Sequence, residues 1–305
     1  MMQRQLRLMG NAFTLMADTS DATLGQAALE AAIAEMQRIE ARFTTFDEGS
    51  ETQLINRMAG ISPVKVSAEM LALVQRSLYL SRLTQGAFDL SYGSLDRRFW
   101  NFDRGMTQLP DRRKARQAVR LINYQHIQVN EARSEIYLAR QGMRIGFGGI
   151  GKGYAADQAA QVMQEMGVAR GCISAAGDLY CWGAAAQPWR VALEVPETVQ
   201  QHLGHLDLTN YAVATSGDYE KAVTIDGVRY SHTIDPRTGF PARAMRSVTV
   251  IAPKAELADA LCTPLMIMGP EVGLHLIDQL PHVEAVIIDP HNQLHVSQRI
   301  HLSHV

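Results

Sequence analysis

The sequence predicts a compact fold in which α-helices and β-strands are intermixed, without the strict alternation of a doubly wound sheet. Helices are indicated where apolar residues recur at helical spacing, and strands where short apolar runs are bounded by turn residues. No internal repeat, low-complexity tract or linker-like stretch interrupts the 305 residues. We therefore expect a single domain over residues 1–305, large enough to bury a core.

The first half of the chain supplies a strand, two long helices and a hairpin. Polar and apolar residues alternate over residues 7–14, which predicts a strand. The elements that follow are helices over 22–42 and 68–84, an irregular charged region over 96–125 packed down by Phe99 and Trp100, a hairpin formed by 126–130 and 135–140, and a helix over 154–166.

The second half is richer in strands. Asp226-Gly227 lies between two strand-like arms over 221–232 and is the favoured two-residue turn of a hairpin. The other elements are buried strands over 172–183 and 189–195, a strand over 247–253, helices over 257–268 and 271–280, and strands over 283–289 and 294–300.

Composition excludes several classes of function. The formal net charge is −2, with 20% charged and 47% hydrophobic residues. Neither nucleic-acid nor membrane-surface binding is expected, because both need a concentrated basic face.

The N-terminus lacks the continuous apolar core of a signal peptide, so we expect a cytoplasmic protein. Cys172, Cys181 and Cys262 cannot all pair, and we expect free thiols, of which two act as small core residues.

A glycine run over residues 146–153, GFGGIGKG, matches two phosphate-binding patterns. Its spacing satisfies G-x-G-x-x-G of dinucleotide-binding folds and G-x-x-x-x-G-K of the P-loop. Neither context is present, because no βαβ unit surrounds the run and Gly153 cannot supply the magnesium-binding hydroxyl. Two interpretations stay open: a tight loop whose glycines permit close packing, or backbone that approaches a ligand beside a helix N-terminus.

Several segments, taken together and in this order, carry a resemblance to a known family. They are LMGNAFTLMA, LTQGAFDLSYGSL, the glycine run, AVATSGDYEKAVTIDGVRY, SHTIDPRTGFP and the helix with A-D-A-x-x-T. This series resembles the FAD:protein FMN transferases, the ApbE family, from Leu8 to near the C-terminus. The resemblance implies an α+β fold related to the T-fold, with mixed and antiparallel sheets and long helices enclosing a flavin cleft.

The activity that the resemblance implies is Mg²⁺-dependent transfer of FMN from FAD, with release of AMP. The acceptor would be a Thr or Ser hydroxyl of a flavoprotein, in a motif similar to D-x-x-[ST]-G-A-[ST]. His232 matches the family's general base, and an imidazole suits that role because its unperturbed pKa lies near neutral. The alternative for His232 is a structural bond to a turn carbonyl.

Three residues match the family's metal ligands. Asp259 and Thr263 lie four apart on a predicted helix, so their oxygens face the same side. Oxygen donors are what Mg²⁺ accepts. The family also uses a backbone carbonyl of the glycine segment, which here is that of Gly149. The alternative is an Asp favoured near a helix N-terminus and a Thr bonded to a preceding carbonyl.

The remaining matches are contacts with the flavin nucleotide, and each could instead be a packing residue. They are Met9, Phe46, Ala87, Phe88, Asp89, Lys152, Thr215, Ser216, Gly217, Asp218 and Ile234. Lys152 could meet a phosphate with its charge. By the resemblance, FAD is expected between the glycine run, the turn at Ala87 and the hairpin that carries His232.

Two positions depart from the family's pattern. Gly146 stands where relatives place an aspartate that contacts FAD, and Ala176 stands where a glycine is usual. Both departures concern the nucleotide contacts and leave the base and the metal ligands in place. Two further functions therefore stay open: hydrolysis of FAD to FMN and AMP, and flavin binding without catalysis.

Overall fold

The computed structural model of the chain describes residues 1–100, 108–175, 177–193, 205–217, 222–225, 228–231, 233–242 and 245–300. The chain groups into two compact units. The first unit comprises residues 1–40, 149–217 and 244–305, and the second unit comprises residues 41–148 and 218–243. None of the helices in these described ranges is long and apolar enough to cross a bilayer.

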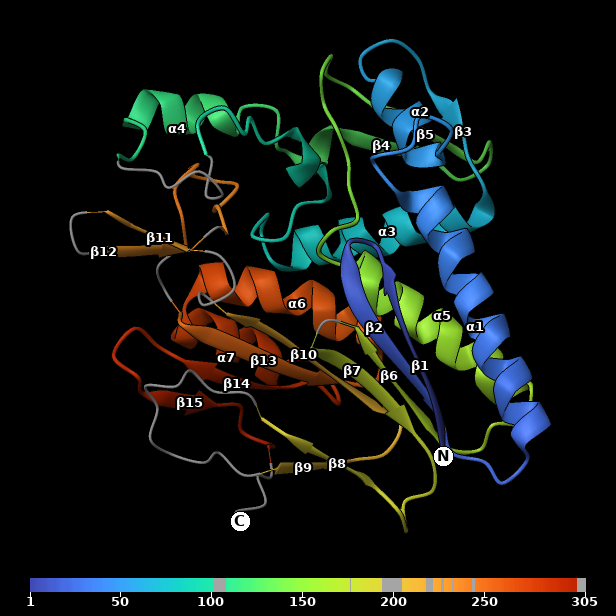
Figure 1. Cartoon of the computed structure of the whole chain (residues 1–305). Coiled ribbons are helices and arrows are strands. Elements are labelled where there is room, and N and C mark those ends of the chain that lie inside the picture. The colour runs from blue at the N-terminus through green and yellow to red at the C-terminus, as the bar shows by residue number, and fades with distance from the viewer. Residues whose placement is uncertain are drawn as a thin grey trace. The chain divides into compact units, whose positions relative to one another are not determined.

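The first unit holds most of the strands (Figure 1). Its elements are β1 (Met2–Leu8), β2 (Asn11–Ala17), α1 (Ala22–Phe43, whose last residues belong to the second unit), α5 (Gly151–Glu165), β6 (Gly171–Ala175), β7 (Asp178–Trp182), β8 (Trp189–Ala192), β9 (His205–Leu208), β10 (Tyr211–Gly217), β13 (Ser247–Ala252), α6 (Ala255–Met268), α7 (Pro270–Asp278), β14 (Glu284–Ile288) and β15 (Leu294–Val296).

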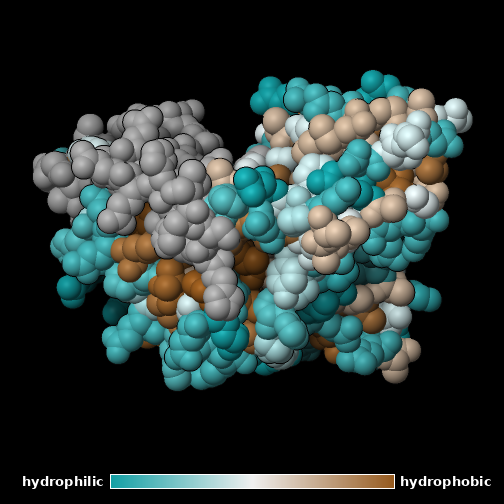
Figure 2. Space-filling model, turned by 90° about the horizontal axis from the view of Figure 1, so that it is seen from below, coloured by the Kyte–Doolittle hydropathy of each residue, from teal (hydrophilic) through white to brown (hydrophobic). Residues whose placement is uncertain are grey.

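An eight-stranded antiparallel sheet organises the described part of the first unit, in the order β1-β2-β6-β7-β10-β13-β14-β15, and β8 pairs with β9 in a separate two-stranded sheet. Because successive side chains point to opposite faces of a strand, the sheet presents two apolar layers. Helices α5 and α6 pack on one face. On the other face Cys172, Cys181 and Val213 pack with Leu206 and Leu208 of β9. The face of the molecule seen in Figure 2 has a patch of exposed hydrophobic residues among hydrophilic ones.

The second unit is built mainly from short elements. They are α2 (Glu51–Arg57), β3 (Val64–Lys65), α3 (Ala68–Leu83), the 3₁₀ turns η1 (Leu90–Ser94) and η3 (Tyr124–His126), α4 (Arg112–Ala118), β4 (Ile127–Asn130), β5 (Glu135–Leu138), β11 (Ala222–Ile225) and β12 (Val228–Ser231). Strands β3, β5 and β4 form a small antiparallel sheet, and β11 pairs with β12. Trp100 and Ile234 share an apolar cluster with residues at the end of α4.

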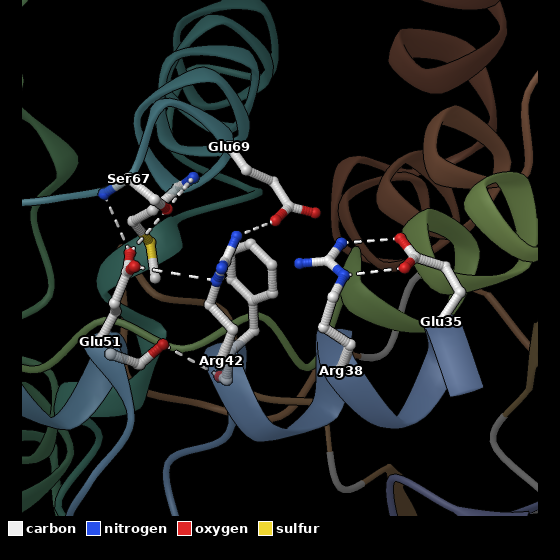
Figure 3. A network of polar contacts seen from close by, with 9 residues as sticks. Glu35, Arg38, Arg42, Glu51, Ser67 and Glu69 are labelled. Carbon is white, nitrogen blue, oxygen red and sulfur yellow. Dashed lines mark hydrogen bonds and ion pairs between the residues drawn. The ribbon is translucent and has the colours of Figure 1, made fainter. Parts of the chain in front are cut away.

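A polar network joins the end of α1 to α2 and α3 (Figure 3). Arg42, at the end of α1, forms ion pairs with Glu51 of α2 and Glu69 of α3. Ser67 caps α3 with its hydroxyl, and that hydroxyl also donates to the Glu51 carboxylate at 2.9 Å. Glu51 and Glu69, in the first turns of α2 and α3, therefore stabilise the dipoles of their own helices and also pair with the Arg42 guanidinium.

Most predicted elements are confirmed, and the fold is α+β as the resemblance implied. The predicted strand over 7–14 is wrong, because Met9 and Gly10 have φ of +52° and +73° and form the turn between β1 and β2. Positive φ at both central residues is the signature of a type I′ hairpin turn. Helix α4 lies in the region predicted to be irregular, and α2 was not predicted.

Candidate active site

The glycine run enters a helix earlier than its sequence suggested. Helix α5 begins at Gly151, three residues before the predicted start at Tyr154. Lys152 therefore lies in the first turn of the helix, and its position is fixed by helical geometry rather than by a loop. Ile150 precedes the helix and provides no side-chain cap, so the first backbone N–H groups of α5 need other partners.

Gly153 is the glycine of the run that close packing requires. A Cβ at this position would lie 2.2 Å from the carbonyl oxygen of Ala255 and 2.5 Å from its carbonyl carbon. The Gly153 N–H donates to Asp259 Oδ2 at 3.1 Å. A Ser or Thr side chain cannot be accommodated there, because α5 approaches the start of α6 through this bare backbone. The position that broke the P-loop pattern is thus a helix–helix contact.

A second residue of α5 holds the start of α6. Asp157 Oδ1 accepts the Ala255 N–H at 2.9 Å, and Oδ2 accepts the Glu256 N–H at 3.0 Å. Two N–H groups that the helix leaves unpaired are satisfied by one carboxylate from a neighbouring helix. Burial raises the pKa of Asp157 to about 6, although both backbone bonds oppose that shift. This cap fixes the end of α6 that precedes Asp259.

Lys152 is held between two aspartates of the first unit. Its ammonium lies 2.6 Å from Asp178 Oδ2 and 2.9 Å from Asp259 Oδ1. The second oxygen of Asp178 accepts the Thr215 N–H at 3.2 Å. Each aspartate is 6% exposed, and the Lys152 side chain is 22% exposed. We call Lys152, Asp178 and Asp259 the lysine–aspartate cluster.

The lysine–aspartate cluster carries two carboxylates and one ammonium, so one negative charge is in excess when all three are ionised. Burial opposes the charge of Lys152, but Asp259 and Asp178 outweigh it and hold the pKa of the ammonium above its ordinary value. Burial raises the pKa of Asp178 to about 6, with Lys152 opposing that shift and Asp259 adding to it. Lys152 is therefore charged at neutral pH.

The donors around Asp259 fit a hard cation. Thr263 follows Asp259 by one turn of α6 and is half-buried, so a hydroxyl accompanies the carboxylate on that side of the helix. Within the described residues, no group of three or more His, Cys, Asp or Glu is placed to hold a metal ion. A site with only a few protein oxygen ligands suits Mg²⁺, because this ion is usually bound through one or two carboxylates together with substrate phosphates and water.

Other predicted contacts of the first unit lie at two places. Thr215, Ser216 and Gly217 end β10, and the Thr215 hydroxyl lies 2.9 Å from that of Thr249 on β13. Through its N–H, Thr215 also joins the lysine–aspartate cluster. Met9 lies in the β1–β2 turn, where its N–H donates to Glu40 Oε1 at 2.6 Å. Among the described residues, no hydrogen bond joins Met9 to the lysine–aspartate cluster.

Asp89 and Ile234 have structural bonds within the second unit. Asp89 accepts the Ser91 N–H and hydroxyl on one oxygen and the Tyr124 N–H on the other, at 2.8, 2.6 and 2.8 Å. Burial raises its pKa, and these bonds oppose the shift. The Ile234 N–H donates to the Tyr92 hydroxyl at 3.2 Å.

The apolar candidates of the second unit differ in exposure. Ala87, Phe88 and Ile234 are 2%, 6% and 0% exposed, which is the burial of core residues. Phe46 is 96% exposed. Ala87, Phe88 and Ile234 are therefore packed in the core, whereas Phe46 presents its ring to solvent, and the nucleotide contacts of all four stay predictions.

His232, Asp218 and Ala176 lie outside the described residues. Two further aspartates, Asp178 and Asp157, make contacts that the sequence did not predict. Asp178 ends the segment Ala176-Gly177-Asp178, which matches the family's G-G-D pattern, but no role was predicted for it. Nothing in the sequence pattern marks either as a partner of Lys152 or of α6, since both contacts join segments distant in the chain.

Comparison with known proteins places the chain in a family. The model of the ApbE family matches residues 9–287. The chain belongs to the ApbE family. Among curated ApbE-related proteins, the FAD:protein FMN transferase of Treponema pallidum is 30% identical over 291 residues, which are 90% of this chain and 80% of that protein. The Escherichia coli K12 FAD:protein FMN transferase is 33% identical over 242 residues, 77% of this chain and 69% of that protein.

Solved ApbE structures share the fold. The ApbE protein of Thermotoga maritima superposes with a TM-score of 0.86 at 29% identity, covering 97% of both chains. The flavin transferase ApbE of Vibrio cholerae gives a TM-score of 0.81 at 26% identity, also covering 97% of both chains. The family membership and the α+β fold implied by the sequence are confirmed.

Proposed function

We propose that this ApbE-family flavin transferase moves FMN from FAD onto a Thr or Ser hydroxyl of an acceptor flavoprotein and releases AMP, with Mg²⁺ as cofactor. The observation that carries the proposal is the lysine–aspartate cluster, in a chain whose curated relatives bear the name FAD:protein FMN transferase. A half-buried ammonium next to a carboxylate that can bind a hard cation suits a substrate that contains a pyrophosphate.

The reaction balances without redox chemistry. The acceptor oxygen forms a bond to the phosphorus on the FMN side of the pyrophosphate. The bond from that phosphorus to the bridging oxygen breaks, and AMP leaves with the bridging oxygen. His232 takes the proton of the acceptor hydroxyl, a role suited to an imidazole near neutral pH. Such a general base contributes roughly 10²- to 10⁴-fold to a rate.

Three residues of the first unit are proposed to hold the metal: Asp259, Thr263 and the carbonyl of Gly149. When bound, Mg²⁺ offsets the negative charge of the pyrophosphate and of the leaving AMP. The Asp259 carboxylate is kept in one orientation by the Gly153 N–H and the Lys152 ammonium. Lys152 is proposed to direct its charge toward the pyrophosphate, since its ammonium stays protonated.

Nucleotide contacts are proposed for the remaining family-matched residues. Phe46, with its exposed ring, is available for stacking on an aromatic ring system. Met9, Thr215, Ser216, Gly217 and Asp218 are proposed to border the flavin nucleotide. Ala87, Phe88, Asp89 and Ile234 are proposed to act by shaping the backbone that faces FAD, because their side chains are buried.

The test measures both products of one incubation. The protein, FAD and an acceptor domain bearing a D-x-x-[ST]-G-A-[ST] motif are incubated with Mg²⁺ or with EDTA. AMP is quantified by chromatography, and the acceptor is analysed by intact mass. We expect one AMP for each acceptor that gains the mass of FMN less water, and neither product in EDTA.

Other outcomes would replace the proposal. AMP and free FMN in equal amounts, with no acceptor adduct over several acceptor domains, would assign the chain as an FAD hydrolase. FAD binding with neither product in the presence of Mg²⁺ would assign a flavin-binding protein without catalysis.

A further inference from the structure

Asp178 reaches Lys152 from β7, 26 residues further along the chain. Residue 178 is the first of β7, and it pairs with Ala175 at the end of β6. The register places Asp178 on the face of the sheet occupied by α5 and α6, opposite to the face of Leu179 and Cys181. Its carboxylate is therefore directed toward the helices that carry Lys152 and Asp259.

Both oxygens of each aspartate in the lysine–aspartate cluster have a partner. Asp178 divides its oxygens between Lys152 and the Thr215 N–H, and Asp259 divides its oxygens between Lys152 and the Gly153 N–H. The backbone bonds come from β10 and α5, two rigid elements, so the two carboxylates are fixed before any ligand arrives. Lys152 is thereby held at one point between them.

We infer that Asp178 is a positioning residue that holds Lys152 beside the metal ligand Asp259. The inference rests on the proposed function, because it concerns the same pyrophosphate site. A divalent cation on Asp259 and the ammonium of Lys152 are like charges that repel at short range. Asp178 supplies the carboxylate that stays with Lys152, so that the lysine and Mg²⁺ can act on one pyrophosphate together.

Removing the Asp178 charge has a specific consequence. Lys152 would then have Asp259 as its remaining carboxylate in the cluster and would compete with Mg²⁺ for it. The effect of Asp178 on metal affinity therefore requires Lys152. A carboxylate that acted only by its negative charge would weaken Mg²⁺ binding when removed, whether or not Lys152 is present.

The experiment is a double-mutant cycle on Mg²⁺ binding and FAD binding. Asp178→Asn, Lys152→Met and the double variant are compared with the wild-type chain by titration calorimetry with MgCl₂ and by flavin fluorescence with FAD. Asp157→Asn is the matched control, because it alters another buried aspartate that accepts backbone N–H groups without touching Lys152. Thermal unfolding of each variant establishes that it is folded.

We expect Asp178→Asn to raise the Mg²⁺ Kd by roughly tenfold, and by less than about twofold in the Lys152→Met background. We expect FAD affinity in EDTA to fall in Lys152→Met and to fall no further in the double variant. Equal effects of Asp178→Asn in both backgrounds would overturn the inference.

The outcomes separate this inference from the proposed function. A non-additive cycle in a chain that gives no acceptor adduct supports the positioning role and rejects the transferase. An additive cycle in a chain that does modify the acceptor rejects the positioning role alone. A wild-type chain that binds neither Mg²⁺ nor FAD overturns both.

An independent observation concerns two cysteines on the opposite face of the same hairpin. Cys172 of β6 and Cys181 of β7 are direct cross-strand partners, and their sulfurs lie 3.0 Å apart as free thiols. Directly opposed residues of an antiparallel pair have Cα atoms about 4.5 or 5.5 Å apart, and both values lie within the range that disulfides span. Cys262 is buried elsewhere and donates to the Ala214 carbonyl.

We propose that Cys172 and Cys181 are a disulfide-forming pair when the chain folds in the presence of a disulfide oxidant such as oxidised glutathione. The two thiols lose two electrons and two protons, and form one S–S bond. The glutathione disulfide takes both electrons and both protons and leaves as two glutathione thiols, so the exchange is balanced. The disulfide would link β6 covalently to β7 within the hairpin that carries Asp178.

The test counts thiols after refolding. The full chain is refolded from urea with oxidised or with reduced glutathione, and the reaction is quenched in acid. The protein is then denatured and alkylated with iodoacetamide, and its intact mass is measured by mass spectrometry. We expect one alkylated cysteine after oxidation and three after reduction. A peptide map should link Cys172 to Cys181. Cys262→Ala should keep the link, and Cys172→Ala should abolish it. Three alkylated cysteines in the oxidised sample, or a link that includes Cys262, would overturn the proposal.

Discussion

In the first unit the Lys152 side chain bonds to the side chains of Asp178 and Asp259, whereas in the second unit Asp89 accepts bonds from Ser91 and from the Tyr124 backbone. Lys152, Asp259 and Asp89 were selected from the sequence by the same resemblance, whereas Asp178 was not. The lysine–aspartate cluster leaves one negative charge in excess near the start of a helix. The carboxylate of Asp89, in contrast, is fully used in hydrogen bonds to neighbouring parts of the second unit. Mutual pairing of buried charges is costly to build, so it indicates a functional site more strongly than burial does.

Two glycines of the glycine run also differ in their surroundings. Gly153 in the first unit has no room for a Cβ, because Ala255 backbone atoms lie within 2.5 Å of where one would be. Gly148 in the second unit has nothing within 4 Å of that point. One glycine run thus contains a residue fixed by helix packing and a residue that the local structure does not restrict.

The largest expected effect comes from Gly153→Ser. The added side chain would push α5 away from α6 and break the Gly153–Asp259 bond. We expect a loss of about 4 kcal/mol or more in the free energy of unfolding, measured by urea denaturation. The matched change is Gly148→Ala, for which we expect a change within about 1 kcal/mol. Equal losses in the two variants would remove the contrast between these glycines.

The pH dependence of stability tests the cap on α6. The pKa of Asp157 in the folded chain is about 6, above its ordinary value of 3.8, so the folded state holds the proton more tightly than the unfolded state. The free energy of unfolding should therefore fall as pH rises from about 4 to about 6, with a contribution on the order of 3 kcal/mol from this group. Urea denaturation at a series of pH values measures it.

Asp157→Asn is the variant that isolates this group. The amide does not titrate, so the fall between about pH 4 and pH 6 should become smaller, although Asp178 titrates in the same window. An unchanged pH profile would contradict the assignment of Asp157 as a buried, titrating cap.

A middle-sized effect is expected from Asp89→Asn in the second unit. The amide cannot accept at both oxygen positions, so at least one bond to Ser91 or Tyr124 is lost. We expect the free energy of unfolding to fall by about 2 kcal/mol. FAD affinity, measured by fluorescence on the folded variant, should fall together with stability, because Asp89 is proposed to act by shaping the backbone that faces FAD. Stability held constant with affinity lost would reverse the comparison between the units.

The smallest expected effect is that of Gly146→Asp. A Cβ there would have Thr45 Cγ2 as its nearest neighbour at 3.6 Å, an ordinary contact. We expect stability to change by less than about 1 kcal/mol. If an aspartate at this position contacts FAD as the family resemblance implies, FAD affinity should rise severalfold in a fluorescence titration. Lower affinity would show that this chain has adapted its nucleotide contacts to glycine.

Sequence patterns predicted the fold well where periodicity is strong. The helices over 22–42 and 68–84 and the strand over 247–253 match α1, α3 and β13 within two residues at either end. The strand over 7–14 failed because alternation continues through a two-residue hairpin turn, and Gly10 is an inconspicuous turn signal. Helix α4 was missed because its exposed face is a run of arginine and lysine with no apolar stripe of useful length.

The site was predicted in part. Lys152 and Asp259 were selected by the resemblance, and the structure brings them together. Asp178 completes the cluster, but its contact depends on strand register and on two helices crossing, which no local pattern encodes. His232 remains a prediction, since it lies outside the described residues.

Asp259 is proposed to serve metal-dependent transfer of FMN to a protein hydroxyl. The most direct test of this role is the intact mass of an acceptor domain after incubation with FAD, Mg²⁺ and either the wild-type chain or Asp259→Asn. We expect the wild-type chain to add the mass of FMN less water. We expect the folded variant to do so at least about a hundredfold more slowly, a loss of roughly 3 kcal/mol of transition-state stabilisation. Equal rates of adduct formation by the two proteins, or the absence of an adduct with the wild-type chain, would contradict the account.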